Sequence, residues 1–97
     1  MTAREGRGYA AVMLLAKEKP ELLPLVVAAH EIAETYGNHF SGSSVLTRAP
    51  NIAPTLITLR RRRIVVKTGH SRKGHRAFYS LADPPGVARA LRELELL

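Results

Sequence analysis

The 97-residue sequence contains no cysteine. This absence excludes disulfide bonds, thiolate metal ligands and cysteine nucleophiles, and it fits a protein of the reducing cytoplasm. Long hydrophobic runs are also absent. The longest, Tyr9 to Ala16 and Leu22 to Ala29, have eight residues each, whereas spanning a bilayer takes roughly 20. No signal-peptide cleavage pattern follows the charged start of the chain, so we expect a cytoplasmic protein with no membrane segment and no membrane partner.

Acidic residues are missing from the middle of the chain. Residues 35–82 contain no Asp or Glu but nine basic residues, and the net charge of the whole chain is +7. The nine are Arg48, Arg60, Arg61, Arg62, Arg63, Lys67, Arg72, Lys73 and Arg76. A folded surface normally mixes both signs of charge, so this stretch indicates a polyanionic partner. Nucleic acid is the expected one, although charge alone would also suit an anionic membrane or an acidic protein.

Patterns typical of enzymes and metal sites are missing as well. No Gly-x-Ser-x-Gly elbow surrounds the serines of residues 41–44, and there is no glycine-rich phosphate loop. The four histidines are His30, His39, His70 and His75. No carboxylate or cysteine lies near His70 and His75 in the sequence to complete a metal site. We therefore expect no catalytic activity, no cofactor and no bound metal.

The residues present predict a single α+β domain over residues 1–97. Helices are expected from Gly8 to Lys17, ended by Lys19-Pro20, and from about Pro24 to Tyr36, ended by Gly37-Asn38. In the second helix, Tyr36 is predicted on the buried face and His30 toward water. The polar, glycine-bearing segment from Asn38 to Ser44 is expected to be a loop.

A third helix carries most of the functional prediction. Asn51 is a plausible N-cap, Pro54 suits the first turn, and Ile52, Leu56 and Leu59 share one face. The helix leads into Arg60 to Arg63. Strands are then expected over Ile64 to Lys67 and Ala77 to Leu81, joined by a basic turn from Thr68 to Gly74.

The outward side of that helix provides the candidate contacts to nucleic acid. With the apolar face inward, Thr58, Arg61 and Arg62 point toward base edges or phosphates, and Asn51 and Thr55 approach from the helix start. Arg60 joins them, and the hairpin contributes Arg72, Lys73 and Arg76. No acidic residue nearby in sequence is available to neutralise the four arginines, and Arg63 is expected to turn its stem toward the core. The alternative is that these arginines only complement the helix dipole or lie solvated.

A basic helix followed directly by a basic hairpin resembles the helix-turn-helix and wing of winged-helix DNA-binding domains. More closely, residues 12–97 resemble the PadR family of transcriptional repressors. His30-Glu31-Ile32 stands where that family has a Gly-Tyr-Glu-Ile type sequence. Residues 52–59, Ile-Ala-Pro-Thr-Leu-Ile-Thr-Leu, match a pattern of Ile or Leu, Tyr, Pro, any residue, Leu, any two residues and Leu. Residues 74–81 are similar to the wing strand, which commonly ends in Tyr-x-Leu-Thr.

The resemblance implies a homodimer that binds double-stranded DNA and represses transcription. Residues 83–97 would form the helix that mediates dimerisation. Asp83 is its expected N-cap, Pro84 its first residue, and Val87, Leu91 and Leu94 its apolar face, with packing on the chain's own domain as the alternative. Members of the family often respond to small molecules, but no residue here marks a pocket for such an effector.

Two other functions use the same basic surface. One is a general nucleic-acid binder, architectural or directed to RNA, although five aromatic residues are few for stacking on single strands. The other is a protein-interaction module in which the third helix contacts a protein partner.

Overall fold

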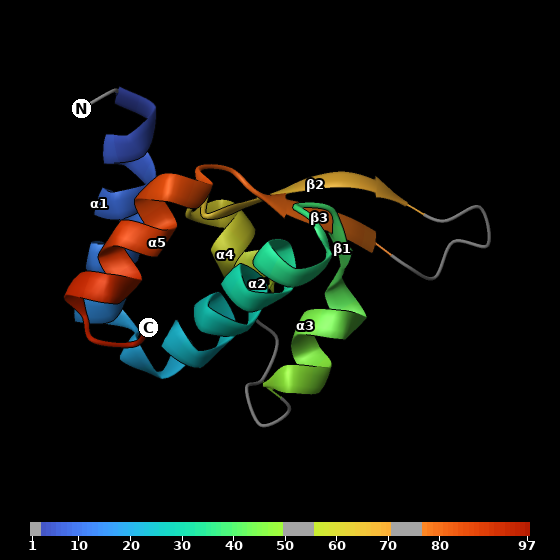
Figure 1. The fold of residues 1–97 in the computed structure, drawn as a ribbon, viewed down its shortest axis with the longest axis horizontal. Coiled ribbons are helices and arrows are strands. Elements are labelled where there is room, and N and C mark those ends of the chain that lie inside the picture. Colours follow the sequence, from blue (N-terminus) through green and yellow to red (C-terminus); the bar gives the residue numbers. More distant parts are fainter. Residues whose placement is uncertain (1–2, 50–55, 71–76) are drawn as a thin grey trace.

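The computed structural model describes residues 3–49, 56–70 and 77–97 (Figure 1). Within these ranges the chain forms α-helices, a short 3-10 helix and β-strands in the following order: α1 (Ala3–Glu18), the 3-10 helix (Pro20–Leu22), α2 (Leu23–Tyr36), β1 (Phe40–Ser41), α3 (Gly42–Arg48), α4 (Leu56–Arg61), β2 (Val65–His70), β3 (Ala77–Leu81) and α5 (Pro84–Glu93). The predicted α+β class is confirmed, and this order of elements is compatible with a winged-helix-like arrangement. No helix in the described ranges has both the length and the apolar character needed to cross a membrane.

The ends of the first two helices follow local signals in the sequence. α1 ends at Glu18, directly before Lys19-Pro20, because the residue before a proline is disfavoured in the helical conformation. It begins five residues earlier than predicted. α2 ends at Tyr36, and Gly37 follows with a φ of 103°, which only glycine adopts without strain.

The segment from Asn38 to Ser44 is not the loop that its composition predicted. Phe40 is buried and pairs with Tyr79 to form β1, and α3 begins two residues later at Gly42. The hydroxyl oxygen of Ser41 accepts a hydrogen bond from the Ser44 amide at 3.3 Å and so caps α3. Burial of Phe40 and this cap together order a segment that is too polar to be recognised from hydrophobic periodicity.

The three strands form an antiparallel sheet in the order β1-β3-β2. Val65 lies opposite Leu81 and Val66 opposite Ser80, and a bulge interrupts the ladder between Lys67 and Gly69. β2 extends to His70, three residues beyond the predicted strand, and the remainder of the predicted turn lies outside the described residues. In Figure 1 the β2–β3 hairpin points away from α1 and α5.

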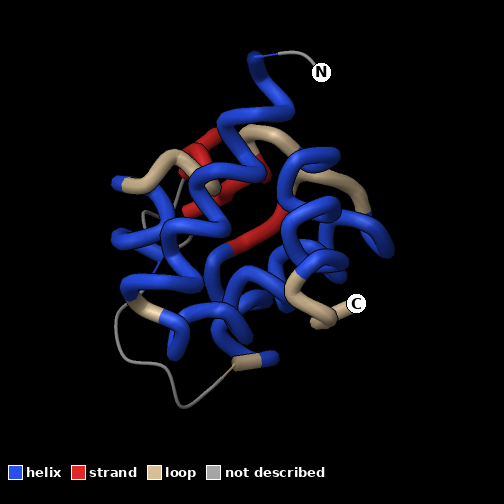
Figure 2. The backbone as a smooth tube through the Cα atoms, turned by 90° about the vertical axis from the view of Figure 1, so that its left-hand side faces the viewer, coloured by secondary structure: helices blue, strands red, loops and turns tan. Residues whose placement is uncertain are grey.

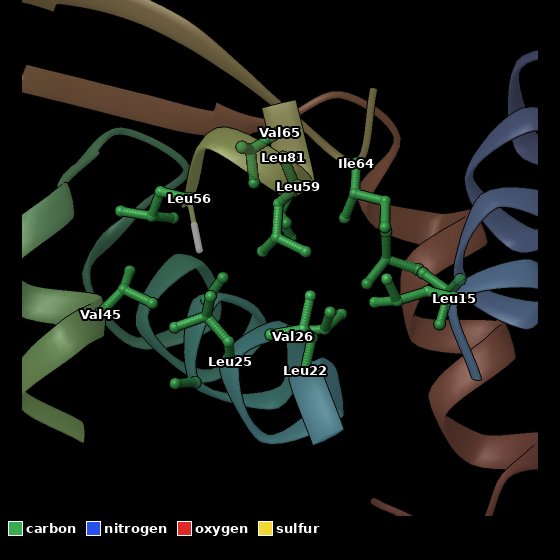
Figure 3. Close-up of a cluster of buried hydrophobic side chains, with 14 of the residues drawn as sticks. Leu15, Leu22, Leu25, Val26, Val45, Leu56, Leu59, Ile64, Val65 and Leu81 are labelled. Atoms are coloured by element: carbon green, nitrogen blue, oxygen red, sulfur yellow. The ribbon is translucent and has the colours of Figure 1, made fainter. Parts of the chain in front are cut away.

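A continuous hydrophobic core joins the helices to the sheet (Figure 3). The side chains labelled there are Leu15 of α1, Leu22, Leu25 and Val26 around the start of α2, Val45 of α3, Leu56 and Leu59 of α4, and Ile64, Val65 and Leu81 of the sheet region. Two predictions for α2 were wrong. His30 is only 8% exposed and Tyr36 is 73% exposed, because α5 packs against α2 near His30, whereas Tyr36 lies at the exposed end of the helix.

The helices α1 and α5 lie side by side in both views (Figures 1 and 2). The Gly8 amide donates to Asp83 Oδ2 at 2.9 Å, and the Gly86 amide donates to Asp83 Oδ1 at 3.3 Å. Asp83 is therefore the predicted N-cap of α5, and it also ties α5 to α1. A Cβ atom on Gly8 would lie 2.5 Å from Asp83 Oδ2, so this close approach requires glycine.

Further contacts along this pair fix α5 against α1. The Arg89 guanidinium lies 4.5 Å from the centre of the Tyr9 ring, and a hydrogen bond to Glu93 raises the pKa of Tyr9 above its ordinary value. Val87 and Leu91 are fully buried in the chain's own core, and Leu94 packs against it. The face assigned to dimerisation is thus already covered within one chain at Val87 and Leu91.

Candidate nucleic-acid interface

The helix α4 has one anchored side and one exposed side. Leu56 and Leu59 are buried in the core, as predicted. On the other side Arg60 and Arg61 are exposed, Thr58 is half-buried, and Ile57 is 59% exposed. The structure therefore brings Thr58, Arg60 and Arg61 together on one short helix with a neighbouring isoleucine. Asn51 and Thr55, the other two candidates of the predicted helix, lie outside the described residues.

The end of α4 has the hydrogen bonds of a Schellman motif. The Arg63 amide donates to the Arg60 carbonyl at 3.0 Å, and the Ile64 amide donates to the Leu59 carbonyl at 2.9 Å. Arg63 itself has a φ of 62°, a left-handed conformation that favours glycine. This turn directs Ile64 into the core beside Leu59 and leaves Arg63 exposed. The prediction that Arg63 turns inward was wrong for this reason.

Arg62 differs from the other arginines at the end of α4 because it is paired with an acidic residue. Its Nη1 donates to Glu18 Oε1 at 2.8 Å, and so the ion pair ties the end of α4 to the end of α1. The sequence has no acidic residue near the four arginines, as noted above, but the fold brings Glu18, 44 positions away, to Arg62. A direct contact between Arg62 and nucleic acid stays a prediction.

Other exposed cations lie on the neighbouring elements. Arg48 is at the end of α3 and Lys67 is on β2. Among the described basic residues of segment 35–82, only Arg62 forms an ion pair. Arg72, Lys73 and Arg76, predicted for the tip of the hairpin, lie outside the described residues. We call Arg48, Arg60, Arg61, Arg63 and Lys67 the basic surface.

The distribution of charge along the chain isolates this surface. The segment 35–82 has nine basic and no acidic residues, whereas the rest of the chain has six basic and eight acidic residues. In Figure 1, α3 and the hairpin lie at the end of the molecule away from the α1–α5 pair, with α4 between them. Charges of both signs thus occur on the α1–α5 pair, and α2 carries Glu31 and Glu34, while α3, α4 and the sheet contribute only cations.

A polar contact that the sequence did not reveal holds the hairpin in place. His39 precedes β1, and its Nδ1 forms a hydrogen bond of 3.0 Å with the Thr68 hydroxyl on β2. Its ring also stacks on Phe78 of β3, with the ring centres 5.2 Å apart and the planes 7° from parallel. One residue therefore contacts both strands of the hairpin and sets its orientation relative to α3, which follows β1 directly.

The described residues contain no group of three or more metal-ligating side chains. His30 lies 3.6 Å from Glu34 on the same helix, and His39 is engaged by Thr68. His75 and the side chain of His70 are not among the described parts of the chain. What the described part of α4 offers chemically is positive charge from Arg60 and Arg61, one hydroxyl from Thr58 and one aliphatic side chain from Ile57.

Comparison with protein-family models, with curated proteins and with solved structures found no match to this chain. The resemblance to PadR proteins therefore stays a prediction, and the function has to be argued from the residues and their geometry.

Proposed function

We propose that the protein binds double-stranded DNA through α4 and the β2–β3 hairpin, as a winged-helix transcriptional regulator that represses by occupying a promoter. The observation that carries this proposal is the exposed pair Arg60 and Arg61 on a helix whose opposite side, at Leu56 and Leu59, is fixed in the core. A helix held in this way presents its arginines without having to be ordered on binding, which lowers the entropic cost of association.

The dimensions of DNA agree with this arrangement. The major groove is about 12 Å wide and admits one α-helix, and arginine is the side chain that most often contacts guanine there. The hairpin, held by His39, would then lie over the adjacent backbone. With α4 in the groove, Arg48 and Lys67 on the flanking elements are suited to contact phosphates.

The charge of the basic surface predicts a strong dependence on salt. Each phosphate neutralised contributes about 0.9 to the slope of log K against log salt concentration. A protomer that placed all five cations of the basic surface on phosphates would therefore show a slope of about −4.5. The proposal thus requires binding that weakens steeply as salt rises.

Homodimer formation is part of the proposal, but it needs another surface than the apolar stripe of α5. Val87 and Leu91 are occupied by intrachain packing. Exposed aliphatic side chains remain at the same end of the molecule, at Leu14 of α1 and at Leu96 and Leu97 after α5. A two-fold axis through this end would leave both basic surfaces free and place two half-sites about 10 base pairs, or a multiple of it, apart.

The test is selection of bound duplexes from a random pool by the purified protein at about 150 mM salt, near cellular ionic strength. Enrichment of a palindrome is expected, and the spacing of its halves reports the dimer geometry. Binding without enrichment would instead support a general, architectural nucleic-acid binder. An absence of binding would refute the proposal and leave the protein-interaction module, which also uses α4.

A further inference from the structure

Ile57 is the apolar residue on the exposed side of the described part of α4. Its side chain is 59% exposed, while Leu56 and Leu59 of the same helix are buried. Solubility and helix formation would both be better served here by Lys, Gln or Ala, since β-branched residues lose side-chain freedom in a helix. A single exposed isoleucine needs no explanation elsewhere on a protein, but this one lies among the cations proposed to enter the major groove.

The spacing on α4 places Ile57 on the same face as both exposed arginines. Residues three and four positions apart are neighbours on a helix, so Ile57 adjoins Arg60 and Arg61. With a rise of about 1.5 Å per residue, the separation along the helix axis is about 4.5 Å to Arg60 and about 6 Å to Arg61. Successive base pairs are about 3.4 Å apart, so the isoleucine and an arginine would face base pairs one or two steps apart.

We infer that Ile57 recognises the C5-methyl group of thymine in the major groove, beside the base pair contacted by Arg60 or Arg61. This inference rests on the proposed DNA binding. Thymine is the only standard base that presents a methyl group in that groove, and it is read by apolar contact. Cytosine has only a hydrogen where thymine carries this methyl group, and the purines present the polar atom N7, whose desolvation against isoleucine would not be compensated by a hydrogen bond. Ile57 thus favours a thymine, whereas the neighbouring arginine favours a guanine.

The experiment replaces each thymine of the duplex enriched from the random pool by uracil, one at a time. Uracil keeps the hydrogen-bonding groups of thymine and removes only the methyl group. Removal of one methyl contact corresponds to about 0.8 kcal/mol, which is about a fourfold weaker Kd. We expect this loss at one position in each half-site, and recovery of affinity when 5-bromouracil, whose bromine is similar in size to a methyl group, occupies that position.

Two variants assign the effect to the side chain. Ile57→Ala is expected to bind the thymine duplex about as weakly as the unaltered protein binds the uracil duplex, and to show no difference between thymine and uracil. Tyr36→Ala is the control, because Tyr36 is 73% exposed at the end of α2, outside both α4 and the end of the molecule proposed for the dimer contact. It should keep the full preference for thymine. Thermal unfolding of both variants would verify that they are folded, as expected for exposed positions.

The outcomes separate this inference from the proposed function. If a duplex is enriched but uracil substitution changes no affinity, DNA binding stands and methyl recognition is refuted. Methyl recognition by this side chain is refuted as well if Ile57→Ala keeps the preference for thymine. If no duplex is enriched at all, the proposed function and this inference fall together.

Discussion

The α1–α5 pair and the basic surface hold their charged groups in opposite ways. Between α1 and α5, Asp83 is buried and accepts two backbone hydrogen bonds, and Arg89 lies over the ring of Tyr9. On the basic surface, Arg60 and Arg61 are exposed, in a segment without any acidic residue. The first arrangement satisfies polar groups within the chain and stabilises the fold. The second keeps charge available, which favours a polyanionic partner.

The two regions also share one type of helix ending. α5 ends, like α4, in a Schellman motif, in which the Glu95 amide donates to the Arg92 carbonyl at 3.0 Å and the Leu96 amide donates to the Leu91 carbonyl at 2.9 Å. Glu95 has a φ of 61°, almost the value of Arg63 after α4. Both positions would favour glycine. One carries a positive charge next to α4, and the other carries a negative charge next to α5.

The largest effect is expected from reversing charge on the basic surface. Arg60→Glu combined with Arg61→Glu replaces two phosphate or base contacts by repulsion, so we expect Kd for the selected duplex to rise at least about a thousandfold, or over about 4 kcal/mol. Arg4→Glu with Arg92→Glu makes the same change in net charge on the α1–α5 pair. Fluorescence anisotropy at fixed salt measures both. Equal losses for the two double variants would mean that net charge, and not this surface, governs binding.

Gly8→Ala tests the close packing of α1 on α5. Alanine ordinarily favours a helix over glycine by about 1 kcal/mol, but its Cβ would lie 2.5 Å from Asp83 Oδ2. Asp83 cannot move away without losing its role as N-cap, so we expect a net loss of about 2 kcal/mol in the free energy of unfolding.

Chemical denaturation of the single and double variants measures this. In an Asp83→Gly background, which removes the Cβ atom of residue 83 (2.7 Å from a Cβ on Gly8) together with the clashing carboxylate, Gly8→Ala should be neutral or stabilising. A stabilising effect of Gly8→Ala with Asp83 intact would contradict the close packing of the two helices at this point.

Replacing Arg63 and Glu95 by glycine in turn compares the two helix endings directly. Relief of the left-handed conformation should raise the free energy of unfolding by about 1 kcal/mol in each case. DNA affinity should fall only for Arg63→Gly, by a few-fold, because only that change removes a cation of the basic surface. Chemical denaturation measures the free energy of unfolding of each variant, and fluorescence anisotropy measures its Kd for DNA. An equal loss of affinity in Glu95→Gly would show that Arg63 has no particular role in binding.

The smallest effect is expected at the ion pair that connects the two regions. Glu18→Gln removes the partner of Arg62. Because the Glu18 side chain is half-exposed, we expect a loss of only about 0.5 kcal/mol in stability. DNA affinity should stay level or rise slightly, since Arg62 is released and a negative charge is lost. A marked fall in affinity would mean that Glu18 holds Arg62 in the orientation used for binding.

Several elements could be predicted because their signals are local. Pro20 ends α1, Gly37 ends α2, and Asp83 caps α5 immediately before Pro84. The strand-like run from Ala77 to Leu81, after the glycine-bearing turn, predicted a strand with the observed limits. On α4, the spacing of Leu56 and Leu59 was enough to predict which side is buried and therefore that Arg61 faces outward.

The remainder depended on partners distant in the chain. β1 forms because Phe40 meets Tyr79, and Arg62 is neutralised because the end of α1 lies beside the end of α4. His39 holds the hairpin only because β1 adds to its edge. No local sequence pattern indicates these contacts between distant segments.

The sequence by itself determined the α+β class, several helix limits and an acid-free, cationic middle segment, since composition, short-range periodicity and local stop signals decide all three. The tertiary structure decided which cations stay unpaired and which apolar stripe is already covered. Arg60 and Arg61 remain exposed while Arg62 is paired, and Val87 and Leu91 pack within their own chain. The physical reason is that the charge and hydrophobicity of a residue are fixed by its type. Whether that charge is paired and whether that side chain is buried depend on contacts between distant segments, which form only when the chain folds.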